Sequence, residues 1–148
     1  MENELTPVEV FKRARDAGHC GAQCALAYMY QKGIGIEPDA KQAFKRWLKA
    51  AEQGFASAQY EVGVAYLEGV GVERNPAVAL PWLREAARQL LYAESEYRLG
   101  CVYRDGLGVN LDPDRANRWF LLASKHGYPC TDTGEIKPEV VTPSLGPR

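Results

Sequence analysis

The sequence predicts an all-α fold: an α/α superhelical solenoid of helix-turn-helix repeats, with an N-terminal half-repeat helix and an irregular C-terminal tail. Three observations predict it. The 148-residue chain repeats itself at an interval of 36 and then 37 residues. Every copy contains a Gly-x-Gly turn followed by an Asp or Asn that suits a helix start. Apolar residues make up 46% of the chain and charged residues 25%, which is typical of a globular protein rather than a disordered one.

The N-terminal segment, residues 1–17, is expected to cap the stack. Its stretch from Pro7 to Ala17 resembles the second helix of a repeat without the first, with Phe11 in the position of Trp47. Residues 18–126 then hold the three repeats, with boundaries expected at 18–53, 54–89 and 90–126.

The first helix of each repeat is expected at about residues 19–32, 55–68 and 92–105. One face carries a small residue that allows a neighbouring helix to approach closely (Ala27, Gly63 and Gly100). A tyrosine one turn later is expected to fill the space between pairs (Tyr30, Tyr66 and Tyr103). A glycine that takes a positive φ is expected to end each helix (Gly33, Gly69 and Gly106).

The second helix of each repeat is expected at about residues 40–53, 76–89 and 113–126. Side-chain oxygens at the preceding positions can accept hydrogen bonds from free backbone N–H groups (Asp39, Asn75 and Asp112). Pro76 and Pro113 follow at the first helical position, where no donor is needed. Tryptophans are expected to anchor these helices, although the first stands one place later than the others (Trp47, Trp82 and Trp119).

From Gly127 onward the helical period is lost and four prolines occur, so residues 127–148 are expected to form a flexible tail. The alternative is an extended segment that packs on the solenoid. Ile136 to Thr142 is apolar enough to fold back over the last helix pair or into the groove.

Together, four motifs of this chain resemble the Sel-one-like repeat (SLR) family, a relative of the tetratricopeptide repeat. They are Ala-x-x-x-Leu-Gly-x-x-Tyr, Gly-x-Gly-Val, Asp-x-x-x-Ala-x-x-Trp and Ala-Ala. The resemblance covers residues 18–126. It implies an α/α solenoid that serves as a protein-interaction scaffold, with no catalytic residue to carry over.

Composition excludes several classes of function. A net charge of −1 argues against a dedicated nucleic-acid binder, and no apolar run is long enough to span a bilayer. The acidic N-terminus lacks the pattern of a secretory signal, and the four cysteines lack disulfide-framework spacing. A cytoplasmic location is therefore predicted.

The concave groove, lined by the first helices, is the predicted surface for a partner protein or peptide. Its candidate residues are those left after the packing positions are removed: Tyr28, Met29, Lys32, Glu61, Val64, Ala65, Glu68, Arg98, Cys101, Val102 and Asp105. Two kinds of partner are left open: one for which the chain is an adaptor, and a toxin or effector that it inhibits as an immunity factor. A homodimer through the exposed ends of the stack is also open.

Two alternatives come from other residues. The second helices hold nine basic and three acidic residues, so their convex face is a candidate for binding an anionic surface. Cys20 and Cys24 beside His19 are candidates for a redox- or metal-responsive thiol module, but a structural zinc site needs four ligands. Cys101 is a candidate exposed thiol. The glycine turns join two helices and therefore do not match a dinucleotide fingerprint. We expect no catalytic site, cofactor or metal.

Overall fold

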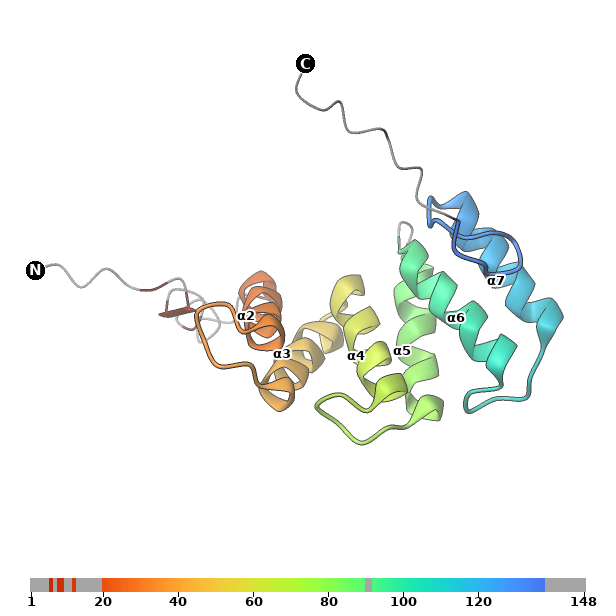
Figure 1. The fold of residues 1–148 in the computed structure, drawn as a ribbon. Coiled ribbons are helices and arrows are strands. Elements are labelled where there is room, and N and C mark those ends of the chain that lie inside the picture. Colours follow the sequence, from red (N-terminus) through yellow and green to blue (C-terminus); the bar gives the residue numbers. More distant parts are fainter. Residues whose placement is uncertain (1–5, 7, 10–11, 13–19, 90–91, 138–148) are drawn as a thin grey trace, which may run out of the picture.

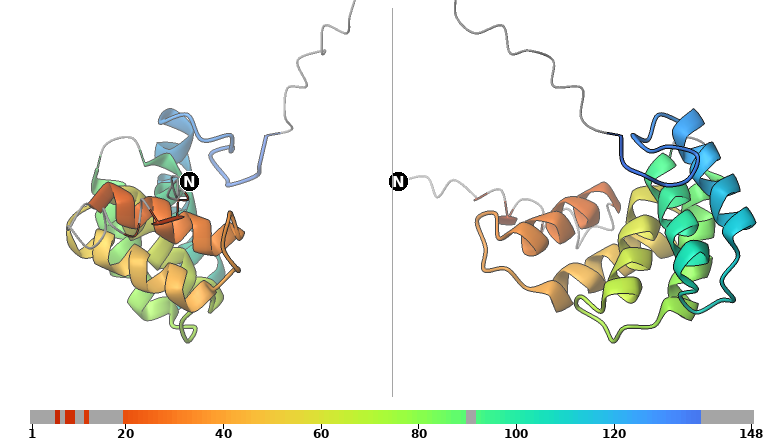
Figure 2. Two further views of the ribbon diagram at one scale, coloured as in Figure 1. Left: turned by 90° about the vertical axis from the view of Figure 1, so that its left-hand side faces the viewer. Right: turned by 45° about the vertical axis from the view of Figure 1, so that its right-hand side comes forward.

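The computed structural model describes residues 6, 8–9, 12, 20–89 and 92–137. In this part of the chain, helices of 13 residues follow one another as three antiparallel pairs. They are α2 (Cys20–Lys32), α3 (Ala40–Glu52), α4 (Ala56–Glu68), α5 (Pro76–Arg88), α6 (Ala93–Asp105) and α7 (Pro113–Lys125). Each helix packs chiefly on its neighbours in sequence, and the pairs follow an arc (Figures 1 and 2). The prediction of an α/α solenoid is confirmed.

Local chemistry sets the helix ends as predicted. The Asp39 side chain accepts hydrogen bonds from the backbone N–H groups of Lys41 and Gln42 at the start of α3, and the caps of α5 and α7 do the same. At the ends of α4 and α6, Gly69 and Gly106 take the left-handed conformation with φ of 71° and 67°.

The second glycine of the later two turns, Gly71 and Gly108, has a different role, which is to let one repeat touch the preceding one. A Cβ atom on Gly71 would lie 2.2 Å from the carbonyl oxygen of Ala40, at the start of α3. Since real Cβ atoms do not approach an oxygen so closely, the turn after α4 can pack on the preceding pair only with glycine here.

Within each pair, a small residue on the first helix faces a large residue on the second. Ala27 packs near Trp47 in one core cluster, and a Cβ on Gly63 would lie 2.7 Å from Leu83. On Gly100 the Cβ would lie 2.4 Å from Phe120. The expectation that small residues allow close approach is confirmed for these pairs.

The one-residue offset of the first tryptophan, visible in the sequence, changes where its ring packs. Trp47 is buried at the position of Leu83 and Phe120 in the later repeats. Trp82 and Trp119 are half-buried one position earlier, and each packs against the core cluster of the preceding repeat. One residue corresponds to about 100° around a helix, so this shift moves the ring from within a pair to the junction between pairs.

The two ends of the stack are covered differently. At the N-terminus, residues 8, 9 and 12 are helical, Val8 is buried, and the Thr6 and Glu9 side chains cap each other's backbone N–H groups. The rest of the expected Pro7–Ala17 helix lies outside the described residues.

At the C-terminus, residues 127–137 pack on the last pair. Tyr128 stacks on Tyr97 with ring centroids 4.5 Å apart, and the buried Cys130 thiol donates to the Phe120 carbonyl oxygen. A backbone bridge joins Cys130 to Ile136, whose side chain is 55% exposed and so does not itself shield the helices. The remainder of the tail, residues 138–148, is not among the described residues.

Candidate functional site

The first helices of the pairs share one side of the arc. Tyr60 on α4 and Tyr92 at the start of α6 lie with ring centroids 5.2 Å apart. Burial is the main cause of the raised pKa of Tyr92, and Glu61 on α4 and Cys24 on α2 are near enough to raise it further. Residues of all three helices therefore lie near this ring. We call this surface of α2, α4 and α6 the inner face.

The inner face carries most of the predicted partner-binding residues. Exposed side chains are Tyr28, Lys32, Glu68 and Asp105, and half-buried ones are Met29, Glu61, Val64, Ala65, Arg98 and Cys101. Val102 was also expected to be accessible, and that expectation is wrong: its side chain is 0% exposed. It belongs to the core cluster of the second and third pairs, in which Leu67, Leu80, Leu83 and Leu99 are also buried.

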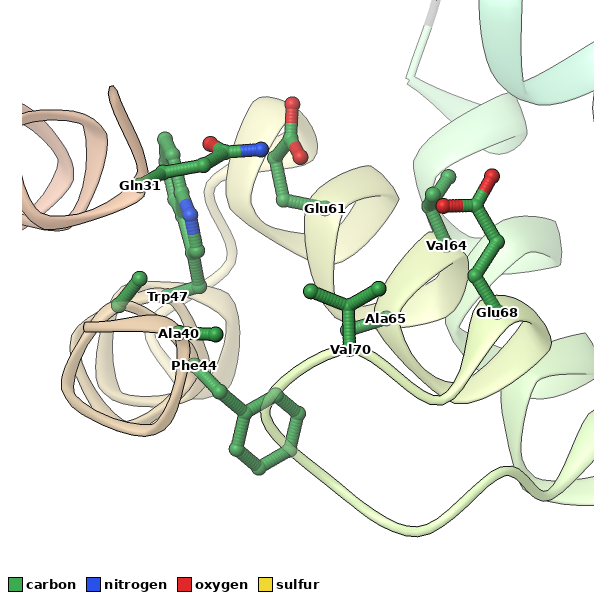
Figure 3. Close-up of a pocket in the computed structure, with 10 residues that line it drawn as sticks. Gln31, Ala40, Phe44, Trp47, Glu61, Val64, Ala65, Glu68 and Val70 are labelled. Carbon is green, nitrogen blue, oxygen red and sulfur yellow. The ribbon is translucent and has the colours of Figure 1, made fainter. Parts of the chain in front are cut away.

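A pocket of about 110 Å³ opens between the first pair and α4 (Figure 3). Four of the predicted residues line it: Glu61, Val64, Ala65 and Glu68. Sequence reasoning missed the rest of the lining, which is Val70 in the turn after α4 and, on the opposite wall, Gln31, Ala40, Ala43, Phe44 and Trp47 of the first pair. We call this hollow the junction pocket.

Comparison of the repeats explains why the junction pocket is open. Gln31 and Ala65 occupy the repeat positions of Leu67 and Val102. At the next junction both of these larger apolar residues are buried in one cluster, so the equivalent space is filled. Around the first junction Gln31 is exposed and Ala65 is too short to reach across. The sequence signal for the pocket is that positions 31 and 65 hold a polar and a small residue where the next copies hold Leu67 and Val102.

The rim of the junction pocket is acidic. Burial raises the pKa of Glu61, and the nearby Glu94 raises it further, whereas a hydrogen bond from Gln31 acts in the opposite direction. Figure 3 shows the Gln31 amide directed at the Glu61 carboxylate. Glu68 lies 3.6 Å from an Arg98 guanidinium nitrogen, and Arg98 also donates to the Tyr60 hydroxyl at 3.3 Å.

Beyond the pocket, tyrosines extend the inner face toward the last pair. Tyr97, Tyr92 and Tyr128 have raised pKa values because burial disfavours their charged form, and that of Tyr97 reaches about 12. These side chains therefore stay neutral and offer ring faces and hydroxyl groups. None of these three tyrosines was among the residues predicted from the sequence to bind a partner.

The cysteines do not gather into a reactive site in the described part of the chain. Burial raises the pKa of both the Cys101 and the Cys130 thiol, which lowers the fraction of reactive thiolate. No group of three or more His, Cys, Asp or Glu side chains suited to a metal occurs among the described residues. Of the proposed thiol module, His19 and the Cys20 side chain fall outside them.

His126, at the end of α7, joins its helix to α6. Its Nδ1 lies 2.8 Å from a carboxylate oxygen of Glu96, which is a buried residue. The equivalent positions in the second repeat, Gln59 and Gln89, are also hydrogen-bonded to each other, at 3.0 Å. The His126–Glu96 contact is therefore a repeat feature that holds the pair together.

No helix within the described ranges has the length and apolar character needed to cross a membrane.

Comparison with known proteins gives the same organisation. The Sel1 repeat family matches residues 21–55, 56–89 and 93–128. A solved structure of a protective antigen present in uropathogenic Escherichia coli strains, displaying an SLR fold, is 34% identical with a TM-score of 0.78, covering 88% of this chain and 27% of that one. A Sel1 repeat protein from Oxalobacter formigenes is 36% identical with a TM-score of 0.68, covering 83% of this chain and 47% of that one.

Among curated proteins, an exopolysaccharide production negative regulator from Rhizobium leguminosarum bv. viciae is 43% identical over 47 residues, which are 32% of this chain and 18% of the regulator. This chain thus spans less than half the length of each of these relatives. The three family matches coincide with the pairs α2–α3, α4–α5 and α6–α7 and cover most of the sequence, and the chain therefore belongs to the Sel1 repeat family.

Proposed function

We propose that this chain is a non-enzymatic scaffold that binds an extended segment of a partner protein along its inner face, with the junction pocket as the anchoring point. Sel1 repeat proteins generally mediate protein–protein interactions, and the repeat is a non-catalytic scaffold. The observation that carries the proposal is the unfilled repeat position between the first and second pairs.

The size of the junction pocket favours a single side chain. Small-molecule sites usually enclose about 300–1,000 Å³, whereas this hollow encloses about 110 Å³. The next junction fills the same space with Leu67 and Val102. An aliphatic side chain of the partner, of the leucine or valine kind, therefore complements the walls formed by Phe44, Val64 and Val70.

The rim favours a positive charge beside that anchor. Glu61 has no Lys or Arg within ion-pair distance in the described part of the chain, and Glu68 has only the partly exposed Arg98 at 3.6 Å. Bringing a partner's Lys or Arg to Glu61 would favour the charged carboxylate, whose formation burial now opposes. We therefore expect a bound segment with an aliphatic residue close to a basic one.

The other predicted residues extend this surface in both directions. Tyr28 and Met29 lie on α2, and Cys101 and Asp105 lie on α6. A narrower form of the proposal makes the bound segment part of a toxin or effector that the chain inhibits. It is supported if a purified toxin loses activity when the wild-type chain is added and regains it with the variant described next.

Selection from a displayed random peptide library tests the proposal without a known partner. The wild-type chain is expected to enrich peptides that combine an aliphatic with a basic residue. In Ala65→Val, the added methyl groups fill the junction pocket as Val102 fills its own junction, so the selected peptides should bind at least about tenfold more weakly.

Ala77→Val is the matched control, because Ala77 is exposed on α5 and its enlargement leaves the pocket unchanged. Glu61→Gln should weaken the same peptides less than Ala65→Val does, and the effect should shrink at high salt. Enriched peptides that bind Ala65→Val and wild type equally would refute the anchoring role of the pocket.

A further inference from the structure

A second hollow lies on the other helices of the last two pairs, away from the inner face. It encloses about 380 Å³ between α5 and α7, above the C-terminal part of α6. Its lining consists of three arginines, two aromatic residues and a leucine: Arg84, Tyr103, Arg115, Arg118, Trp119 and Leu122. We call it the arginine pocket, and none of its residues takes part in the function proposed above.

Two of the arginines converge on a single oxygen atom. Arg84 from α5 and Arg115 from α7 both donate to the hydroxyl of Tyr103, and the Arg115 guanidinium lies 5.1 Å from the centre of the Tyr103 ring. Tyr103 is only 3% exposed, so its oxygen is held in place at the floor of the pocket. A neutral hydroxyl can accept from both guanidinium groups, but it does not neutralise either.

The positive charge of the arginine pocket is poorly compensated. A carboxylate oxygen of Asp112 lies 4.0 Å from Arg115, at the limit of an ion pair. Among the described residues, Arg84 and Arg118 have no carboxylate within that distance. Bringing like charges together without a counter-ion is unfavourable, so an anion between these side chains would relieve their mutual repulsion.

The effect on Tyr103 shows which charge this site favours. Burial raises the pKa of Tyr103, but the hydrogen bonds and charges of Arg84 and Arg115 outweigh burial, and the net pKa lies below its ordinary value. An oxygen atom at the floor of the pocket is thus in a field that favours negative charge.

The arrangement is specific to the junction between the last two pairs. At the junction between the first two pairs, the repeat positions of Arg84, Arg115 and Arg118 hold Leu48, Val78 and Pro81. A general basic face would show the same charges in each repeat, whereas here they occur together at one hollow. The walls beside them, Trp119 and Leu122, are apolar.

We propose that the arginine pocket binds a phosphate monoester, with the phosphate oxygens among Arg84, Arg115 and Arg118 and the organic group against Trp119 and Leu122. Each planar guanidinium group can bind two phosphate oxygens at once. A doubly charged anion suits a site that holds three guanidinium groups. The apolar wall distinguishes an ester from inorganic phosphate.

Isothermal titration calorimetry with phenyl phosphate and with inorganic phosphate tests the proposal on the full chain. Phenyl phosphate should bind at millimolar concentrations or below, and inorganic phosphate about tenfold more weakly. Arg118→Gln should weaken phenyl phosphate binding by about tenfold or more, since it removes a charge-assisted hydrogen bond. Arg118 donates no hydrogen bond to another described side chain, so this variant should keep its fold, which circular dichroism verifies.

Arg88→Gln is the matched control, because Arg88 lies on α5 outside the pocket and is 78% exposed. If Arg118→Gln and Arg88→Gln weaken phenyl phosphate binding equally, the ligand is attracted by net charge alone, and the proposed site is overturned. Equal affinity for phenyl phosphate and inorganic phosphate would overturn the role of Trp119 and Leu122, and no heat of binding with either would overturn the proposal. A phosphotyrosine peptide and adenosine monophosphate then separate a phosphorylated protein from a free nucleotide as the source of the ester.

Discussion

The junction pocket makes Ala65→Val an unusual core substitution, because enlarging the side chain should stabilise the protein. Val102 holds the equivalent position in the next repeat and is completely buried there, which shows that the fold has room for valine in this register. The pocket beside Ala65 encloses about 110 Å³, so the added groups need not displace a neighbour.

The size of the effect follows from two opposing contributions. Valine buries two more methyl groups than alanine, and each buried carbon stabilises by about 0.8 kcal/mol. The β-branched side chain costs about 0.5 kcal/mol in a helix relative to alanine. The free energy of unfolding should therefore rise by about 1 kcal/mol, which corresponds to about 2–4 °C in melting temperature for a chain of this size.

Thermal unfolding followed by circular dichroism measures this shift, with Ala77→Val as the control. Ala77 is exposed on α5, so valine there should bring only the helix cost and lower the melting temperature slightly. If Ala65→Val lowers the melting temperature as much as the control does, the added methyl groups are not buried. The interpretation of the pocket as an unfilled repeat position would then be wrong.

Three further predictions concern the core and one carboxylate. Phe120→Ala should destabilise by about 3–5 kcal/mol, because its fully buried ring supports both α6 and the C-terminal segment, and urea unfolding measures the loss. Gly100→Ala should destabilise by about 1–3 kcal/mol or more, since its Cβ would lie 2.4 Å from Phe120. Gly21→Ala on α2 is the control: its Cβ would meet nothing within 4 Å, so this variant should be neutral or stabilising. A small effect of Gly100→Ala would contradict the close packing of α6 on α7. The pKa of Glu61 is raised in the folded state. Its contribution to the free energy of unfolding is therefore most favourable below its unfolded pKa of about 4.3, and it is lost as the pH rises through its folded pKa. Glu61→Gln should therefore raise the melting temperature at pH 7 and not in acid, and an equal shift at both pH values would rule out this explanation.

Much of the fold could be predicted from the sequence because its signals are local. A glycine in the left-handed conformation at Gly69 and a capping carboxylate at Asp39 depend on residues only a few positions away. The expected range of 55–68 for the first helix of the second repeat differs from α4 by one residue at its start. Repetition at a fixed interval then determines the stacking, since each pair must bury its apolar face on the next.

Only the tertiary structure decided which side chains remain accessible and which come together. Val102 and Ala65 share a repeat position, yet one is buried and the other borders a pocket, because the facing positions hold Leu67 in one junction and Gln31 in the other. The convergence of Arg84 and Arg115 on the Tyr103 hydroxyl likewise joins residues from three helices. The repeat pattern of a single helix does not reveal these contacts, since they depend on side-chain lengths across neighbouring pairs and on how closely the helices approach.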